Sequence, residues 1–187
     1  MVVTHSSNEI RKIKIKNFEL LESISRKNKF LKNFFSDKAT VIMFICNHCP
    51  YVKHINPELV RLTKEYIPKG VSFLAINSND IEKYPEDSPE EMKKISHQLG
   101  YPFPYFFDEK QEVAKYYGAK CTPEFFIFNG LGNLCYHGQL DDSRPGNGIP
   151  VTGNDVREIL QDILEGIEKI TYPKIKPSYG CNIKWKV

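Results

Sequence analysis

Three short apolar runs place the tightest limit on how this chain can fold. They are ATVIMFI at residues 39–45, VSFLAIN at 71–77 and EFFIFN at 124–129, each bounded by polar or turn-forming residues. Runs of this length are typical of central strands that are covered on both faces. Between the first two, PELVRLTKEYIP at 57–68 repeats its apolar residues at helical spacing. The pattern predicts a right-handed strand–helix–strand crossover with parallel strands.

A second helix is predicted from its cap. Ser88 begins SPEEMKKI, with Pro at the first helical position and Glu91 three residues after the serine. This capping pattern predicts a helix that runs to about Leu99 and stops at the glycine that follows. After it, YPFPYFFD at 101–108 predicts a short strand, and EKQEVAKYYG at 109–118 predicts a short helix closed by its glycine.

The last part of the chain predicts a hairpin, a final helix and an irregular tail. NGLGN at 129–133 is a turn between two apolar runs, and NDVREILQDILEGI at 154–167 has a cap and an amphipathic pattern. The tail at 171–187 is basic and contains prolines, so no secondary structure is predicted there. No repeat or linker divides the chain. We expect one α/β domain over residues 1–187, with an N-terminal arm at 1–16 and the tail packed on the domain.

Composition and charge exclude several classes of protein. The chain has 187 residues, of which 41% are hydrophobic and 26% charged, which is typical of a soluble globular protein. No apolar run approaches the roughly 20 residues that a membrane-spanning helix needs. The net charge of +3 comes from residues 1–32, where eight Lys or Arg face three Glu. We interpret this as a solvated basic terminus and predict no nucleic-acid or membrane partner. The N-terminus lacks the apolar centre of a secretory signal, which predicts a cytoplasmic protein.

The cysteines direct attention to one short segment. An odd count of five in a chain of this length does not fit a disulfide scaffold, so a close pair is more typical of redox or metal chemistry. Cys46 and Cys49 lie where a predicted central strand gives way to a helix. Backbone N–H groups at a helix N-terminus lower the pKa of a thiol, and His48, if protonated, would favour the thiolate further. We therefore predict that Cys46 attacks a substrate disulfide and that Cys49, one helical turn on, resolves the mixed disulfide.

Two other interpretations of these residues stay open. Cys46, His48, Cys49 and Cys121 are soft or imidazole ligands that could hold copper(I) or zinc, although no second Cys-x-x-Cys or His pair completes a zinc pattern. Alternatively, the pair could pack as two small buried hydrophobes.

The remaining cysteines are assigned by position. Cys121, two residues before Pro123, is a candidate third redox thiol, a metal ligand or a packed side chain. Cys135, in a predicted hairpin strand, is expected to be buried and inert. Cys181 lies on the tail, which could fold back over the active site and give this thiol a resolving role; otherwise it is an ordinary tail cysteine.

From about residue 17 to the end, the chain resembles a known family. The segments that carry the resemblance are CNHCPYVKHI, AINSND, YPEDSPEEMKK, GYPFPYFFDEKQEVAKYYGAKCTPEFFIF, YHGQLDDSRPGN and GCNIKWK. They are similar to the peroxiredoxin-like branch of the thioredoxin superfamily, the redoxins of AhpC/TSA type. The resemblance implies a thioredoxin fold, with a central mixed β-sheet flanked by helices and a peroxiredoxin-like insertion at 88–117. It also implies a cis peptide bond between Thr122 and Pro123, in a loop that faces the cysteine pair and offers backbone groups to an extended substrate.

The chain departs from true peroxiredoxins at the reactive residues. Those proteins carry a Thr-x-x-Cys motif and a later Arg that activates the peroxide. Here Cys49, followed by Pro50, matches the peroxidatic cysteine, but Cys46 stands at the Thr position. The region of the expected Arg contains Lys120 and Cys121 instead. The resemblance therefore favours thiol–disulfide exchange, with a thiol peroxidase or a metal-binding module as alternatives.

The predicted activity needs no organic cofactor, because the protein's own dithiol carries the electrons. The expected partners are protein or small-molecule disulfides and thiols, including a thioredoxin-type reductant. We expect a monomer or a weak homodimer. His48 stands directly before the second cysteine, as in protein disulfide isomerases. This implies a pair more oxidising than thioredoxin, whose potential is about −270 mV.

Overall fold

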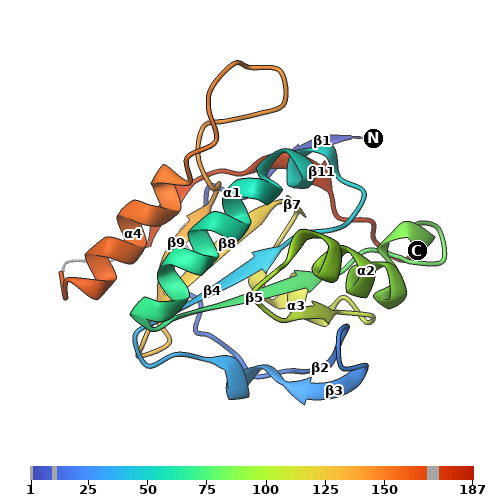
Figure 1. Cartoon of the computed structure of the whole chain (residues 1–187), viewed down its shortest axis with the longest axis horizontal. Helices are drawn as coiled ribbons and strands as arrows, with labels where there is room; N and C mark the ends of the chain where they lie inside the picture. The colour runs from blue at the N-terminus through green and yellow to red at the C-terminus, as the bar shows by residue number, and fades with distance from the viewer. Residues whose placement is uncertain (1, 10–11, 168–172) are drawn as a thin grey trace.

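Two β-sheets organise the computed structural model, which describes residues 2–9, 12–167 and 173–187. The larger sheet is mixed and has eight strands (Figure 1). From edge to edge they are β10 (Lys174–Lys176), β9 (Leu134–Gly138), β8 (Glu124–Asn129), β4 (Ala39–Phe44), β5 (Val71–Asn77), β6 (Tyr105–Phe107), β2 (Glu19–Glu22) and β3 (Lys27–Phe30). Strands β4, β5 and β6 run parallel, whereas β8 is antiparallel to β4 and to β9.

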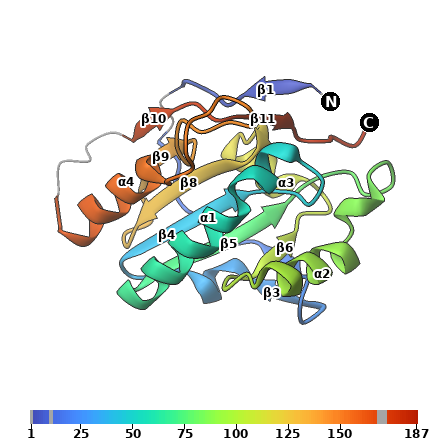
Figure 2. The same ribbon diagram turned by 45° about the horizontal axis from the view of Figure 1, so that its top comes forward.

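The smaller sheet brings both ends of the chain together. Its order is β1 (Val3–His5), β11 (Tyr179–Asn182) and β7 (Cys121–Thr122), and both pairings are antiparallel. The first and last strands consequently lie side by side, as Figures 1 and 2 show from two directions.

Helices cover the two faces of the large sheet unequally. The α-helices are α1 (Pro50–Tyr66), α2 (Pro89–Leu99), α3 (Glu112–Tyr117) and α4 (Asn154–Leu164), and the 3-10 segments are η1 (Leu31–Phe34), η2 (Ile67–Lys69) and η3 (Pro85–Asp87). Helices α1, α2 and α4 pack on one face, with a large apolar cluster beneath them, and α3 and η1 pack on the other (Figure 1). No helix among the described residues is both long and apolar enough to cross a membrane.

The predicted class, a mixed sheet flanked by helices, is confirmed. The apolar runs at 39–45, 71–77 and 124–129 form β4, β5 and β8, and all six residues of β4 are buried. The predicted cap of α2 is also present, since the hydroxyl oxygen of Ser88 accepts a hydrogen bond from the backbone N–H of Glu91. Gly100 ends this helix in the left-handed conformation, which glycine adopts without a steric cost.

Helix α1 extends beyond the segment whose apolar pattern predicted it. That pattern covers residues 57–68, whereas Pro50 occupies the first turn of α1 and Pro57 lies inside the helix. Proline is compatible with the first helical position because its missing N–H has no partner there. Either proline fits that rule, and the amphipathic pattern alone did not choose between them.

The ends of the chain contain strands that the sequence did not predict. The tail forms β10, which extends the large sheet beside β9, and β11, which pairs with β7. Strand β1 lies within the predicted N-terminal arm. Residues 1 and 10–11 of that arm and 171–172 of the tail lie outside the described residues.

A further hairpin, β2–β3, was also missed because its sequence is short and highly charged. It joins the sheet edge through β6. The carboxylate of Glu22 accepts hydrogen bonds from the N–H groups of Ile24 and Ser25 and contacts the ammonium group of Lys29. These bonds hold a turn whose sequence shows little apolar alternation.

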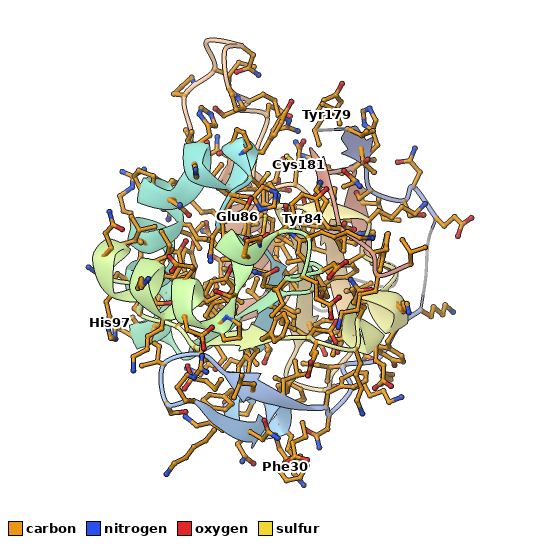
Figure 3. All side chains as sticks on the ribbon, turned by 90° about the vertical axis from the view of Figure 1, so that its right-hand side faces the viewer. Phe30, Tyr84, Glu86, His97, Tyr179 and Cys181 are labelled. Carbon is orange, nitrogen blue, oxygen red and sulfur yellow. The ribbon has the colours of Figure 1, made fainter. Side chains whose placement is uncertain are left out.

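Phe126 tests how much the packing between β8 and α3 contributes to stability. Its ring is fully buried and contacts the rings of Phe44, Tyr117 and His137. We expect Phe126→Ala to lower the free energy of unfolding by about 3–5 kcal/mol, because it leaves a cavity. Phe30→Ala is the matched control: this ring is 45% exposed and lies at the opposite end of the molecule from Tyr179 (Figure 3), so the change should stay within about 0.5 kcal/mol. Urea denaturation measures both, and equal losses would contradict this account.

Candidate active site

The cysteine pair lies at the end of β4, at the centre of the large sheet. The backbone N–H of Ile45 still bonds to the carbonyl of Ile76 in β5, and the chain then leaves the sheet at Cys46. Cys49 is the N-cap residue of α1, and its carbonyl accepts the first two backbone bonds of the helix. The sequence interpretation put the helix start at Cys46; this is wrong, because the segment from Cys46 to Cys49 is a loop.

The Thr122–Pro123 loop faces both thiols. The peptide bond between these residues is cis. The sulfur of Cys46 lies 3.4 Å from the hydroxyl oxygen of Thr122, and the sulfur of Cys49 lies 3.3 Å from the Thr122 carbonyl oxygen. One residue thus contacts the two sulfurs and holds them against the loop.

A third thiol, Cys181, reaches the same place from the C-terminal strand β11. Its sulfur lies 2.9 Å from that of Cys49, although the two residues are 132 positions apart in sequence. Figure 3 shows Cys181 in the same half of the molecule as Tyr84 and Tyr179. Cys46, Cys49 and Cys181 are each at most 2% exposed, so this strand encloses the site.

The surroundings of the thiols favour one thiolate, at Cys49. The contact between the Cys181 and Cys49 sulfurs is the main cause that holds the pKa of Cys49 well below its usual range. Cys46 and the backbone N–H of Val52 in the first turn of α1 act in the same direction. Burial raises the pKa of Cys46 well above its usual range, and contact with Cys49 and the charge of Asp87 add to this.

These environments differ from the ones predicted for the pair. Cys46 was expected to be the nucleophile and Cys49 the resolving thiol. Because the helix begins after Cys49, that residue and not Cys46 receives the stabilisation of the helix N-terminus. The position of Cys49 at the helix N-terminus therefore favours its thiolate form.

His48 is held by a buried carboxylate that the sequence analysis missed. Its Nδ1 lies 2.6 Å from an Asp87 oxygen, and its ring stacks on Tyr84 with centroids 5.4 Å apart. The bond to Asp87 raises the pKa of His48, which favours the imidazolium form beside the thiols. Asp87 also accepts bonds from the backbone N–H of Asn47 and the side-chain amide of Asn79, at 2.7 Å each. The sequence did not single out Asp87 as a site residue, because acidic residues are common beside a helix N-cap such as Ser88.

The other two cysteines have neighbours of their own. The thiol of Cys121 is directed at a carboxylate oxygen of Glu124, 3.6 Å away, and burial together with that carboxylate raises its pKa. The thiol of Cys135 lies 3.5 Å from the Asn133 carbonyl, and burial raises its pKa too. Both environments favour the protonated, unreactive form.

The metal set predicted from sequence does not assemble. Within the part of the chain that the structure describes, the one group with ligand spacing is Cys46, His48 and Asp87, whose ligand atoms lie within 4.8 Å of one another. Both Asp87 oxygens already accept the hydrogen bonds described above, and His48 is one of the partners. Hydrogen bonding alone accounts for the placement of these side chains, so the geometry gives no separate support to a metal.

Comparisons with known proteins agree with the fold. The model of the family described as "AhpC/TSA family" matches residues 12–137. No curated protein matches the chain. An uncharacterized conserved protein from Geobacillus kaustophilus is 57% identical, with a TM-score of 0.93 over 100% of this chain and 97% of that one. A hypothetical protein from Sinorhizobium meliloti 1021 is 39% identical, with a TM-score of 0.92 over 98% and 99%.

More distant structures show the fold alone. A thiol:disulfide interchange protein of the thioredoxin family from Chlorobium tepidum TLS is 17% identical, with a TM-score of 0.62 over 83% of this chain and 99% of that one. The predicted thioredoxin fold is confirmed by this likeness.

The contact between His48 and Asp87 predicts a pH-dependent contribution to stability. We expect His48→Gln to lower the free energy of unfolding by about 1–2 kcal/mol in acid, since it removes a charge-assisted hydrogen bond whose imidazole is partly exposed. The pKa of His48 is raised in the folded state, so this contribution is fully present below the ordinary value of 6.5. It is lost as the pH rises through the raised value.

Urea denaturation of the wild type and the variant, from about pH 5.5 to about pH 9, measures the difference. His97→Gln is the control, because His97 is exposed on α2, away from the site (Figure 3). A difference for His48→Gln that grows with pH would contradict the assignment.

Proposed function

Because the chain belongs to the AhpC/TSA family, we propose that it catalyses thiol–disulfide exchange through Cys49 and Cys46. Membership supports a thiol-based oxidoreductase or peroxidase. The observation that carries the finer proposal is the placement of Cys49 at the start of α1. There its thiolate is stabilised, and a second, protonated thiol lies three residues earlier in the sequence, against the same loop.

The proposed reaction transfers two electrons from the protein to a disulfide. The thiolate of Cys49 attacks one sulfur of the substrate, and the other sulfur leaves as a thiolate. The Cys46 thiol then attacks the sulfur of Cys49, its proton passes to the departing substrate thiolate, and a Cys46–Cys49 disulfide remains. A dithiol of thioredoxin type, or a small thiol, would reverse these steps and restore the reduced protein.

Other residues would assist without taking part in the exchange. His48 adds positive charge near the attacking sulfur when it is protonated, which favours the thiolate. Thr122 and Pro123 form the wall on which the two sulfurs rest, and they would position the substrate disulfide in line with Cys49.

The redox potential of the pair tests this proposal. Stabilising a thiolate stabilises the reduced state, so we expect a Cys46–Cys49 disulfide more oxidising than thioredoxin, above about −270 mV. Disulfide mapping by mass spectrometry, after equilibration in a series of glutathione buffers, gives both the linkage and the potential. Cys135→Ser should leave the transition unchanged. A potential at or below that of thioredoxin would contradict the expected poise, and the absence of any disulfide at Cys49 would overturn the function.

A second candidate, hydroperoxide reduction, is favoured by the same placement of Cys49. In this reaction the thiolate would attack a peroxide oxygen and become a sulfenic acid, which a neighbouring thiol condenses to a disulfide with loss of water. We expect hydrogen peroxide to oxidise Cys49 more slowly than glutathione disulfide does, because Cys46 and Lys120 stand where a peroxidase carries Thr and Arg.

Stopped-flow rates with each oxidant would separate the two candidates. Both rates should collapse in Cys49→Ser, and the first step should survive in Cys46→Ser. If peroxide reacts faster than the disulfide, the peroxidase is the better assignment.

A further inference from the structure

The C-terminal strand β11 brings a thiol closer to the Cys49 sulfur than the carbonyl oxygen of Thr122, which lies 3.3 Å away. The Cys181 and Cys49 sulfurs are 2.9 Å apart, and a disulfide bond needs about 2.05 Å. Less than one ångström of movement therefore separates the contact from a covalent bond. Both side chains are buried, so no solvent lies between them.

The backbone around Cys181 is built for this approach. In the antiparallel pairing of β11 with β7, Cys181 lies opposite Thr122, the residue that contacts Cys46 and Cys49. The preceding residue, Gly180, packs so tightly that a Cβ atom there would lie 2.0 Å from the Thr122 carbonyl oxygen. Real Cβ atoms do not approach an oxygen so closely. Glycine at position 180 is therefore what brings β11 against the loop.

Contacts on both sides of Cys181 fix the strand in this position. Before it, β11 pairs with β1. After it, the N–H of Ile183 donates to the Lys120 carbonyl at 3.0 Å. The carbonyl of Lys184 accepts bonds from the N–H of Asp80 and the side-chain amide of Gln111, each at 2.8 Å. A thiol anchored in this way acts at a high effective concentration toward Cys49.

We propose that Cys181 is a third catalytic thiol, which resolves the mixed disulfide at Cys49, so that the first internal disulfide of the cycle is Cys49–Cys181. This inference rests on the proposed function, because it needs Cys49 as the attacking thiolate. After Cys49 has taken one sulfur of a substrate disulfide, the Cys181 thiol attacks the Cys49 sulfur. The Cys49–substrate bond breaks, and the proton of Cys181 passes to the departing substrate thiolate.

Cys46 then completes the exchange. Its thiol attacks the Cys49 sulfur, Cys181 leaves and regains a proton, and the Cys46–Cys49 disulfide forms without further electron transfer. Overall the protein gives the substrate disulfide two electrons and one proton, and the first substrate thiolate that leaves takes its proton from solvent. In this order of steps, Cys181 on β11 displaces the substrate from Cys49, so the mixed disulfide does not accumulate.

The Cys46→Ser variant of the full chain isolates the proposed step. Treated with glutathione disulfide, quenched in acid, alkylated and mapped by mass spectrometry, it should form a Cys49–Cys181 disulfide. In Cys46→Ser with Cys181→Ser, the Cys49–glutathione adduct should persist on the order of tenfold longer or more. Cys46→Ser with Cys135→Ser is the matched control and should behave as Cys46→Ser alone.

A variant that keeps Cys181 tests the role of the strand. Gly180→Ala in the Cys46→Ser background should slow formation of the Cys49–Cys181 disulfide, because the added methyl group pushes β11 away from Thr122. Circular dichroism verifies that each variant is folded. An undiminished rate would contradict the assigned role of the glycine and of the close strand contact.

The outcomes also distinguish this inference from the proposed function. If Cys46→Ser accumulates only the glutathione adduct with Cys181 free, while the wild type forms Cys46–Cys49, then Cys181 is not the resolving thiol and the proposed function stands. If neither protein forms any internal disulfide, both proposals fall.

Discussion

The pairing of β4 with β8 is the interaction on which the site depends. The two strands are antiparallel, and their register places Phe44, at the end of β4, opposite Glu124, at the start of β8. The chain leaves β4 toward Cys46 at the same edge where the Thr122–Pro123 loop enters β8. A shift of the register by one residue would move every side chain of β8 to the other face of the sheet. The buried aromatic residues of β8 oppose that shift, and so the packing of the core fixes the distance between thiols and loop.

Two buried carboxylates near the thiols each contact a histidine. Asp87 contacts His48, and Glu124 contacts His137. Buried charges are costly unless hydrogen bonds satisfy them, and both carboxylates accept further bonds from backbone N–H groups. Such networks hold their members in one arrangement. In the site, hydrogen bonds to Asp87 and Glu124 therefore hold the side chains and backbone near the thiols in fixed positions.

Local patterns predicted the elements whose causes are local. The buried strands follow from runs of apolar residues, and α2 follows from the Ser88 cap and Gly100. For the cysteines, the predicted start of α1 was Cys46, whereas the helix begins at Pro50 with Cys49 as its cap. That error assigned the stabilisation of the helix N-terminus to the wrong cysteine, since the favourable end of the helix dipole belongs to the residue at its cap. Which thiol a helix N-terminus stabilises can be predicted only if the first residue of the helix is predicted correctly.

Long-range contacts set the rest of the site. From the sequence, the approach of Cys181 stayed open as one possibility, and the contact with Asp87 was not identified. Asp87 reaches His48 across 39 positions, and Cys181 reaches Cys49 across 132. The pairing of β11 depends on a glycine whose need arises from a carbonyl on another strand. No spacing rule connects such residues, because the fold, not the chain, makes them neighbours.

Cys49 and Cys181 are 132 positions apart in the sequence, so Cys49 is synthesised well before Cys181. Chains emerge from the ribosome N-terminus first, and domains can begin to fold before synthesis ends. The strands β4, β5 and β8 all precede residue 130, so the frame around Cys49 can form while the residues of β11 are still missing. During that interval the cysteine lacks both its contact with Cys181 and the strand that encloses it. A nascent chain therefore presents a more accessible and less acidic thiol than the finished protein does.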